Sequence, residues 1–133
     1  MAQTIPDLWP EIEQTQVVPP VAILREQAAL LGKKTNHLLE GRVVTSTNIS
    51  GGFTHSFDIV APTLDDYTYR LFSITHGVIP YPVETTEKDE RGYFSSVSLA
   101  SEQELLDYIR KILNSDETKK VVGSLLAQVK AAS

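Results

Sequence analysis

LEGRVVTSTNISGGFTHSFDIVA, residues 39–61, is the stretch that decides the fold of this chain. It holds two runs in which apolar or aromatic residues alternate with polar ones, and Ser50-Gly51-Gly52 separates them. A period of two is typical of strands with one buried face, and a short loop containing glycine is typical of a hairpin. A three-residue loop over 50–52 keeps paired side chains on one face of the sheet. It predicts the cross-strand pairs Ile49–Phe53, Thr47–His55, Thr45–Phe57 and Val43–Ile59.

Residues 67–75 are predicted to form the third strand, because the turn-forming residues 62–66 precede them. This strand is apolar on both of its faces, so its pattern leaves two registers open. We prefer the register in which Asp58 lies beside Arg70, because opposite charges on facing strands stabilise a pair. The same register pairs Tyr69 with Ile59, Leu71 with Phe57 and Ser73 with His55.

The segments before and after these strands predict helices. Pro19-Pro20 opens a helix over residues 20–35, because proline is tolerated in the first turn of a helix. Ser101 and Glu104 have the spacing of a capping box that starts a second helix. Asn114 ends this helix, and the acidic segment 115–117 starts a third one.

The chain between the third strand and these helices is expected to run extended through residues 78–85 and to form another strand over 93–99. The mixed charges of residues 84–91 indicate a solvated, mobile loop. The predicted fold class is therefore α+β: an N-terminal helix, an antiparallel β-meander of four to five strands, and two C-terminal helices. Residues 1–18 are predicted to be a polar N-terminal arm and residues 19–133 a single domain.

The composition argues against several classes of function. The chain of 133 residues has no cysteine, which excludes disulfides and thiolate chemistry and suits a reducing compartment. Its net charge of -5 disfavours binding to nucleic acid. No apolar run approaches the ~20 residues that are needed to span a membrane. We therefore expect a cytoplasmic protein that binds neither nucleic acid nor membranes.

The histidines are the candidates for chemistry. The predicted register places His55 on the apolar face between Thr47 and Ser73, which makes these three residues candidates for a ligand pocket. A serine beside a histidine does not suffice for nucleophilic catalysis, which also needs an orienting group and an oxyanion hole. His76 is expected on the opposite face from His55, so the two are not expected to share a metal ion. We predict no catalytic residue, no metal site and no cofactor.

A second set of residues predicts a protein interface. The second face of the sheet is expected to be half-apolar with a charge pair at one edge, which is typical of an interface. The alternative is that a C-terminal helix covers this face. Two aromatic side chains, one in the arm and one between two prolines, are further contact candidates. The interface candidates are Val44, Val60, Phe72, Ile74, Trp9 and Tyr81.

Two functions from different classes stay open. The leading one is a small non-enzymatic protein-interaction or accessory protein, with a protein partner or a homodimer formed through the open sheet face. The alternative is a small-molecule-binding domain or minor enzyme with a pocket between the helix and the curved sheet, around Thr47, His55 and Ser73. A stable dimer or protein partner would favour the first, and a bound small molecule would favour the second.

Overall fold

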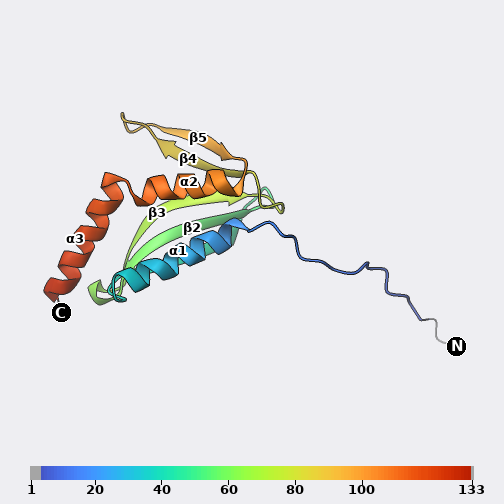
Figure 1. The fold of residues 1–133 in the computed structure, drawn as a ribbon, viewed down its shortest axis with the longest axis horizontal. Coiled ribbons are helices and arrows are strands. Elements are labelled where there is room, and N and C mark those ends of the chain that lie inside the picture. Colours follow the sequence, from blue (N-terminus) through green and yellow to red (C-terminus); the bar gives the residue numbers. More distant parts are fainter. Residues whose placement is uncertain (1–3, 133) are drawn as a thin grey trace.

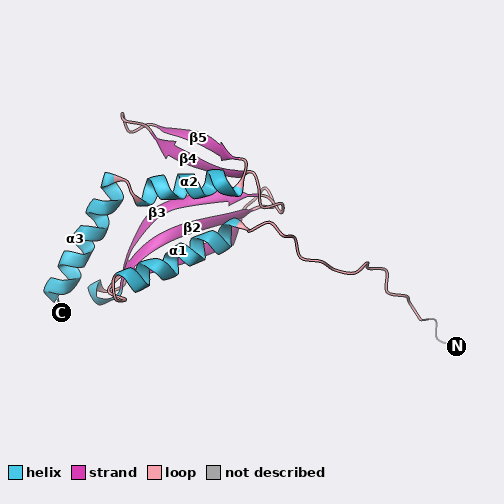
Figure 2. Ribbon diagram, viewed as in Figure 1, coloured by secondary structure: helices cyan, strands magenta, loops and turns pink. Residues whose placement is uncertain are grey.

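The computed structural model describes residues 4–132, which form three α-helices and one antiparallel sheet (Figures 1 and 2). In chain order the elements are α1 (Pro20–Lys34), β1 (Glu40–Thr47), β2 (Phe53–Ala61), the short 3-10 helix η1 (Pro62–Leu64), β3 (Tyr67–His76), β4 (Val83–Lys88), β5 (Phe94–Leu99), α2 (Glu102–Leu113) and α3 (Asp116–Ala132). The order in the sheet is β1-β2-β3-β4-β5. This confirms the predicted α+β fold, with five strands in the meander. Residues 1–3 of the predicted arm and Ser133 lie outside the described residues.

The helices cover one face of the sheet. α1 and α2 cross this face next to each other, and α3 turns away from the end of α2 toward η1 (Figure 1). α1 approaches β1 closely because Gly41 has no side chain, and a Cβ added there would lie 2.5 Å from Ala28 Cα. The core fills the space between the helices and this face, and its most deeply buried side chains are Leu24, Leu39, Ile59, Ile74, Val83, Leu105 and Val129.

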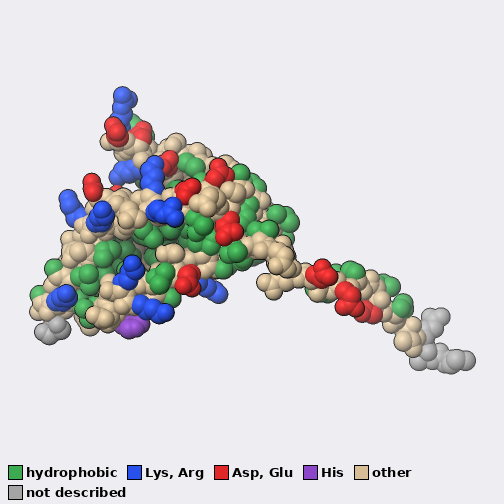
Figure 3. All heavy atoms as spheres, viewed as in Figure 1, with side chains coloured by type: hydrophobic (Ala, Val, Ile, Leu, Met, Phe, Trp, Pro, Cys, Tyr) green, Lys and Arg blue, Asp and Glu red, His purple; other side chains and the backbone are tan. Residues whose placement is uncertain are grey.

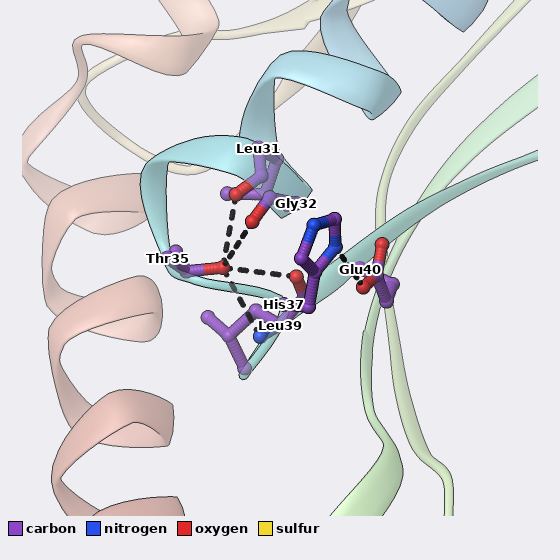
Figure 4. A network of polar contacts seen from close by, with 6 residues as sticks. All are labelled: Leu31, Gly32, Thr35, His37, Leu39 and Glu40. Carbon is purple, nitrogen blue, oxygen red and sulfur yellow. Dashed lines mark hydrogen bonds and ion pairs between the residues drawn. The ribbon is translucent and has the colours of Figure 1, made fainter.

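The turn from α1 into β1 is held by Thr35 (Figure 4). Its buried hydroxyl oxygen lies 2.9 Å from the carbonyl oxygen of Leu31 and 3.0 Å from that of Leu39, and it accepts the Leu39 N–H at 3.2 Å. The Thr35 side chain thus forms hydrogen-bond contacts with backbone groups at both the end of α1 and the start of β1. His37 is exposed beside this turn, with Nδ1 2.9 Å from Oε1 of Glu40.

The predicted register of the first hairpin was wrong by two residues. Thr47 faces Phe53, Thr45 faces His55, Val43 faces Phe57 and Gly41 faces Ile59. The loop spans residues 48–52 instead of 50–52, because Asn48 closes it. Gly52 N–H donates to Asn48 Oδ1 at 2.9 Å, and Asn48 N–H donates to the Gly52 carbonyl at 3.0 Å. A shift of two residues keeps every side chain on its predicted face, so the period-two pattern is satisfied by both registers.

The predicted register of β3 against β2 is correct at one end of the strand and wrong at the other. Tyr69 faces Ile59 and Arg70 faces Asp58 as predicted, but the next pairs are Phe57–Phe72, Ser56–Ser73 and His55–Ile74. Leu71 is the extra residue of a β-bulge, and it does not face Phe57. A bulge of one residue reverses which side chains point to which face.

Burial is the physical reason for the bulge. It turns Phe72 and Ile74 onto the helix-covered face, where both are buried and where the Phe72 ring stacks on Phe57 at 5.5 Å. Burying each of these side chains contributes roughly 1.5–3 kcal/mol. The prediction that both lie on the second face was therefore wrong, while the Asp58–Arg70 pair on that face was correct.

Most of the charged run after β3, residues 84–88, belongs to strand β4 and is not a loop, while residues 89–91 lie in the turn between β4 and β5. β4 pairs with β5 along its whole length, from Val83–Leu99 to Lys88–Phe94. Only the residues that face the helices, Val83 and Thr85, are buried, while the alternate charged side chains are solvated. The alternation of buried and exposed side chains, rather than the overall charge, thus determines that this segment forms a strand.

Candidate functional site

The sheet splits between β3 and β4. These two strands are paired at a single position, Thr75–Glu84, whereas the other neighbouring strands are paired along most of their length. Beyond this pair the strands diverge (Figure 1) and border a cavity of about 550 Å³. We call this cavity the β3–β4 cleft. Its lining is formed by residues 69–73 of β3, 85–88 of β4, and Phe94, Tyr108, Lys111, Ile112, Ser115, Glu117 and Thr118.

The cleft lies at the edges of the two strands. Five consecutive residues of β3 and four of β4 line it. Because consecutive residues of a strand point to opposite faces of the sheet, a cavity lined by all of them lies along the strand edge. Residues of both the helix-covered face and the second face therefore border the cleft.

Side chains close the narrow end of the cleft. The Thr85 hydroxyl donates to the Ser73 carbonyl at 2.8 Å, and the Tyr108 hydroxyl donates to the Thr86 carbonyl at 3.1 Å. The two hydroxyl oxygens are themselves 2.9 Å apart. Ser73 and Thr86 are two residues away from the Thr75–Glu84 pair, so their carbonyls point to the edges that the split leaves without a strand partner. Burial raises the pKa of Tyr108, which keeps this phenol protonated as a donor.

The two sides of the cleft differ in chemistry. On the side of the helices the wall contains Phe72, Tyr108 and Ile112 together with the polar side chains of Ser115, Glu117 and Thr118. Lys111 and Glu87 form an ion pair there. On the second face the rim carries Arg70 and Lys88 beside the exposed ring of Phe94, which faces Lys88 across the strands. Asp58, buried next to the cleft, pairs with Arg70 Nε at 3.1 Å.

Most of the charged and hydroxyl groups in the cleft already have partners. Glu117 Oε1 accepts from the Tyr69 hydroxyl at 3.4 Å, and burial together with Glu117 raises the pKa of Tyr69. Glu87 is paired with Lys111. Within residues 4–132 there is no group of three or more His, Cys, Asp or Glu side chains that could hold a metal ion. The arrangement is suited to binding more than to proton transfer.

The predicted pocket residues are not brought together. Thr47 faces Phe53 at the end of β1, and Ser73 lies on the second face, where its hydroxyl is 2.8 Å from that of Ser56. His55 is 3% exposed on the opposite face. Of the three candidates, only Ser73 lines the β3–β4 cleft. The bulge at Leu71 places Ser73 on the other face of the sheet from His55. The longer hairpin loop pairs His55 with Thr45 instead of Thr47.

His55 instead pairs with His76, with 2.9 Å between the two Nε2 atoms. The prediction that these histidines lie on opposite faces was wrong, because the bulge also turns His76 around. His76 Nδ1 is 2.6 Å from the Gly77 carbonyl, which only accepts, so this nitrogen carries a proton. In the neutral pair His55 Nε2–H therefore donates to His76, and His55 Nδ1 accepts from the Thr45 hydroxyl at 2.9 Å. Burial, His76 and Arg25 lower the pKa of His55.

The second face is less apolar than predicted. Phe72 and Ile74 belong to the core, which leaves Val44, 40% exposed, and the buried Val60 as the apolar interface candidates there. The rest of the face in β1–β3 is made of hydroxyl and charged side chains, including Thr54, Ser56, Thr68 and Arg42. Among the described residues, α1 and α2 both lie on the opposite face (Figure 2).

The two aromatic candidates outside the sheet have different environments. The Tyr81 hydroxyl donates to the Val18 carbonyl at 3.0 Å, so this side chain anchors the root of the N-terminal arm. Trp9 lies farther out in the arm, and Ile5, Leu8, Trp9 and Ile12 are each more than three quarters exposed. Figure 3 shows the arm projecting from the body with hydrophobic and acidic side chains along it.

Sequence reasoning missed the cleft because it depends on how far two strands diverge. One signal was present: Tyr108 places a hydroxyl in the apolar stripe of α2 (Glu102–Leu113), where a buried hydroxyl needs a partner. No protein-family model matches the chain, and neither a curated protein nor a solved structure matches it. Within residues 4–132, no helix has the length and apolar character that crossing a membrane requires.

Proposed function

We propose that this is a non-catalytic interaction protein that binds an extended polypeptide segment in the β3–β4 cleft. The observation that carries the proposal is the lining of one cavity by consecutive residues of two neighbouring strands. An extended peptide that lies along a strand edge adds a strand to the sheet, with backbone hydrogen bonds for affinity and side-chain pockets for specificity.

The backbone edges supply the attraction. Beyond the single Thr75–Glu84 pair, the facing edges of β3 and β4 lack each other as hydrogen-bond partners. Each backbone hydrogen bond with a bound segment contributes about 0.5–1.5 kcal/mol net. Thr85 and Tyr108 already serve the carbonyls at the narrow end, so the bound segment occupies the wide end.

The two sides of the cleft supply the specificity. Alternate side chains of an extended segment would point toward Phe72, Tyr108 and Ile112 on one side and toward Lys88 and Phe94 on the other. The cleft thus favours a segment with apolar residues at every second position and acidic or aromatic residues between them.

A small-molecule ligand is the second candidate, because about 550 Å³ lies within the roughly 300–1,000 Å³ that such pockets occupy. The edge position of the cleft favours a peptide, since both strands offer backbone groups along its length.

Selection of linear peptides from a random display library against the full chain tests the proposal. We expect enriched peptides with apolar residues at alternate positions, and backbone amides of residues 69–73 and 86–88 that exchange hydrogen more slowly in the complex. Phe94→Ala should weaken binding about tenfold, as loss of one buried aromatic contact does.

Tyr93→Ala is the matched control, because Tyr93 and Phe94 are adjacent and each 70% exposed, but Tyr93 does not line the cleft. No enriched peptide, or a peptide that protects other amides and is insensitive to Phe94→Ala, would contradict the proposal. Small molecules that bind with the same amide changes, in the absence of any peptide ligand, would favour the second candidate.

A further inference from the structure

The N-terminal arm, residues 4–19, exposes apolar side chains that the rest of the molecule does not cover. Ile5, Leu8, Trp9 and Ile12 are 84%, 83%, 77% and 76% exposed. The hydrogen bonds in the arm are local, from Trp9 N–H to Asp7 and from Val17 N–H to Thr15, apart from the Tyr81 contact at its root. Clusters of exposed apolar side chains in a polar setting mark interaction sites.

The pattern of the arm is that of a strand with two different faces. At even positions it places Pro6, Leu8, Pro10 and Ile12, which are all apolar. Between residues 6 and 13 the odd positions hold Asp7, Trp9, Glu11 and Glu13, which are acidic apart from one aromatic, while the apolar Ile5 precedes this pattern. In an extended segment these two sets point in opposite directions.

The backbone of the arm is suited to pairing along one edge. Pro6 and Pro10 lack N–H groups and stand on the same edge, because residues two or four apart share an edge in a strand. The other edge keeps the N–H groups of Ile5, Asp7, Trp9 and Glu11. Such a segment can pair with one of the two strand edges that border the wide end of the cleft.

The chemistry of the arm is complementary to that of the β3–β4 cleft. The even, apolar set matches the wall formed by Phe72, Tyr108 and Ile112. The odd set matches the opposite rim, where Arg70 and Lys88 are basic and the exposed ring of Phe94 offers a contact for Trp9. The arm contains three acidic residues and no basic one between positions 4 and 19.

We propose that the segment bound in the β3–β4 cleft is the N-terminal arm of a second copy of this chain. This inference rests on the proposed function of the cleft. Tyr81, in the connection between β3 and β4, holds the root of the arm at the narrow end of the cleft, and the arm runs from there away from its own body (Figures 1 and 3). A reciprocal exchange of arms closes a dimer, and a one-way exchange makes an open chain.

Trp9 is the single tryptophan of the chain and reports on its own docking. We expect the full-length protein to form dimers or larger assemblies in native mass spectrometry and light scattering as its concentration rises. The tryptophan emission should shift to shorter wavelength over the same concentration range, because the indole leaves water.

A synthetic peptide of residues 4–19, TIPDLWPEIEQTQVVP, isolates the interaction. It is added to the full-length Trp9→Ala protein, so that the peptide carries the only tryptophan. We expect saturable binding, and a loss of affinity of about tenfold with Lys88→Glu in the protein, because that change removes an attraction and adds a repulsion. Lys119→Glu is the matched control, because Lys119 is exposed but does not line the cleft.

A monomer with solvent-exposed Trp9 at all concentrations, together with no binding of the arm peptide, would overturn the inference. A monomer whose tryptophan emission is already at short wavelength and independent of concentration would also overturn it, since the arm would then dock on its own body. If display peptides bind the cleft while the arm peptide does not, the proposed function stands and this inference fails.

Discussion

Gly41 decides how closely α1 can approach β1. A Cβ at this position would lie 2.5 Å from Ala28 Cα and 2.7 Å from Ala28 Cβ, and neither atom can move without shifting the helix. We expect Gly41→Ala to lower the free energy of unfolding by about 1–3 kcal/mol, the range found when cores are overpacked. Urea denaturation followed by circular dichroism measures this change.

Gly123 is the matched control for Gly41. It lies inside α3, and a Cβ added there would meet nothing within 4 Å. Gly123→Ala should therefore raise the free energy of unfolding by up to about 1 kcal/mol, because alanine favours the helix. Equal effects at both positions would contradict the close packing of α1 on β1.

Tyr108 holds the narrow end of the β3–β4 cleft through its hydroxyl. Tyr108→Phe keeps the ring, which packs edge-on against Phe72 at 6.1 Å, but removes the donor to the Thr86 carbonyl. We expect a loss of about 0.5–1.5 kcal/mol in the free energy of unfolding, the net contribution of one hydrogen bond, because this bond is partly buried.

The control for Tyr108 is Tyr69→Phe, which removes an exposed hydroxyl that is 3.4 Å from Glu117. Its effect should stay within about 0.5 kcal/mol, as for most surface changes. Hydrogen exchange should also become faster at residues 85–86 in Tyr108→Phe. If both variants match the original protein, the hydroxyl does not hold the cleft closed.

At the scale of elements, the bulge between β2 and β3 decides the surroundings of the histidine pair. By turning the second half of β3 around, it places His76 against His55 and Phe53 on the helix-covered face. Two Nε2 atoms at 2.9 Å can share one proton but cannot both carry one. The pair is therefore stable with at most one of these nitrogens protonated.

This geometry predicts that acid destabilises the fold. The pKa of His55 is lowered from 6.5 by burial, by His76 and by Arg25. Below about pH 6.5 the unfolded chain binds a proton that the folded chain excludes, so the free energy of unfolding falls as the pH falls from about 6.5 to the folded-state pKa and levels off below it. The slope for one proton is at most about 1.4 kcal/mol per pH unit.

Urea denaturation at several pH values between 7.5 and 5 measures this slope. His55→Gln should flatten it, because the substituted side chain no longer titrates. His37→Gln is the comparison variant, because His37 is exposed and lies outside the pair. A slope that His55→Gln leaves intact would assign the acid sensitivity to other groups.

At the scale of the whole molecule, the proposed docking of the arm on another copy makes the stability of the fold depend on protein concentration. Docking of arms between copies stabilises the folded state by mass action, so the midpoint of thermal unfolding should rise with protein concentration. Deletion of residues 1–17 should abolish this dependence and leave the midpoint of the dilute protein unchanged, because the arm makes few contacts with its own body. Differential scanning calorimetry over a hundredfold range of concentration tests both statements. A midpoint that rises equally for both proteins would place the association elsewhere.

The sequence by itself determined the order of the elements and, apart from β4, the elements themselves. The capping box at Ser101 holds as predicted, since Glu104 N–H donates to Ser101 Oγ at 3.2 Å and Glu104 Oε2 accepts from Ala100 N–H at 2.7 Å. The helix that opens at Pro20, the first hairpin and the Asp58–Arg70 pair are likewise local patterns. Each depends on residues close in the sequence or on charges that attract in only one register.

Only the tertiary structure decided the register of the first hairpin, the bulge and the cleft. A period-two pattern is unchanged by a shift of two residues, so it could not place Thr47 against Phe53. A strand that is apolar on both faces does not specify which half turns inward, and burial of Phe72 and Ile74 under the helices made that choice. At the narrow end of the split between β3 and β4, the Tyr108 hydroxyl and the Thr85 hydroxyl take the place of backbone partners. Those contacts join α2, β3 and β4, and no local pattern in the sequence encodes them.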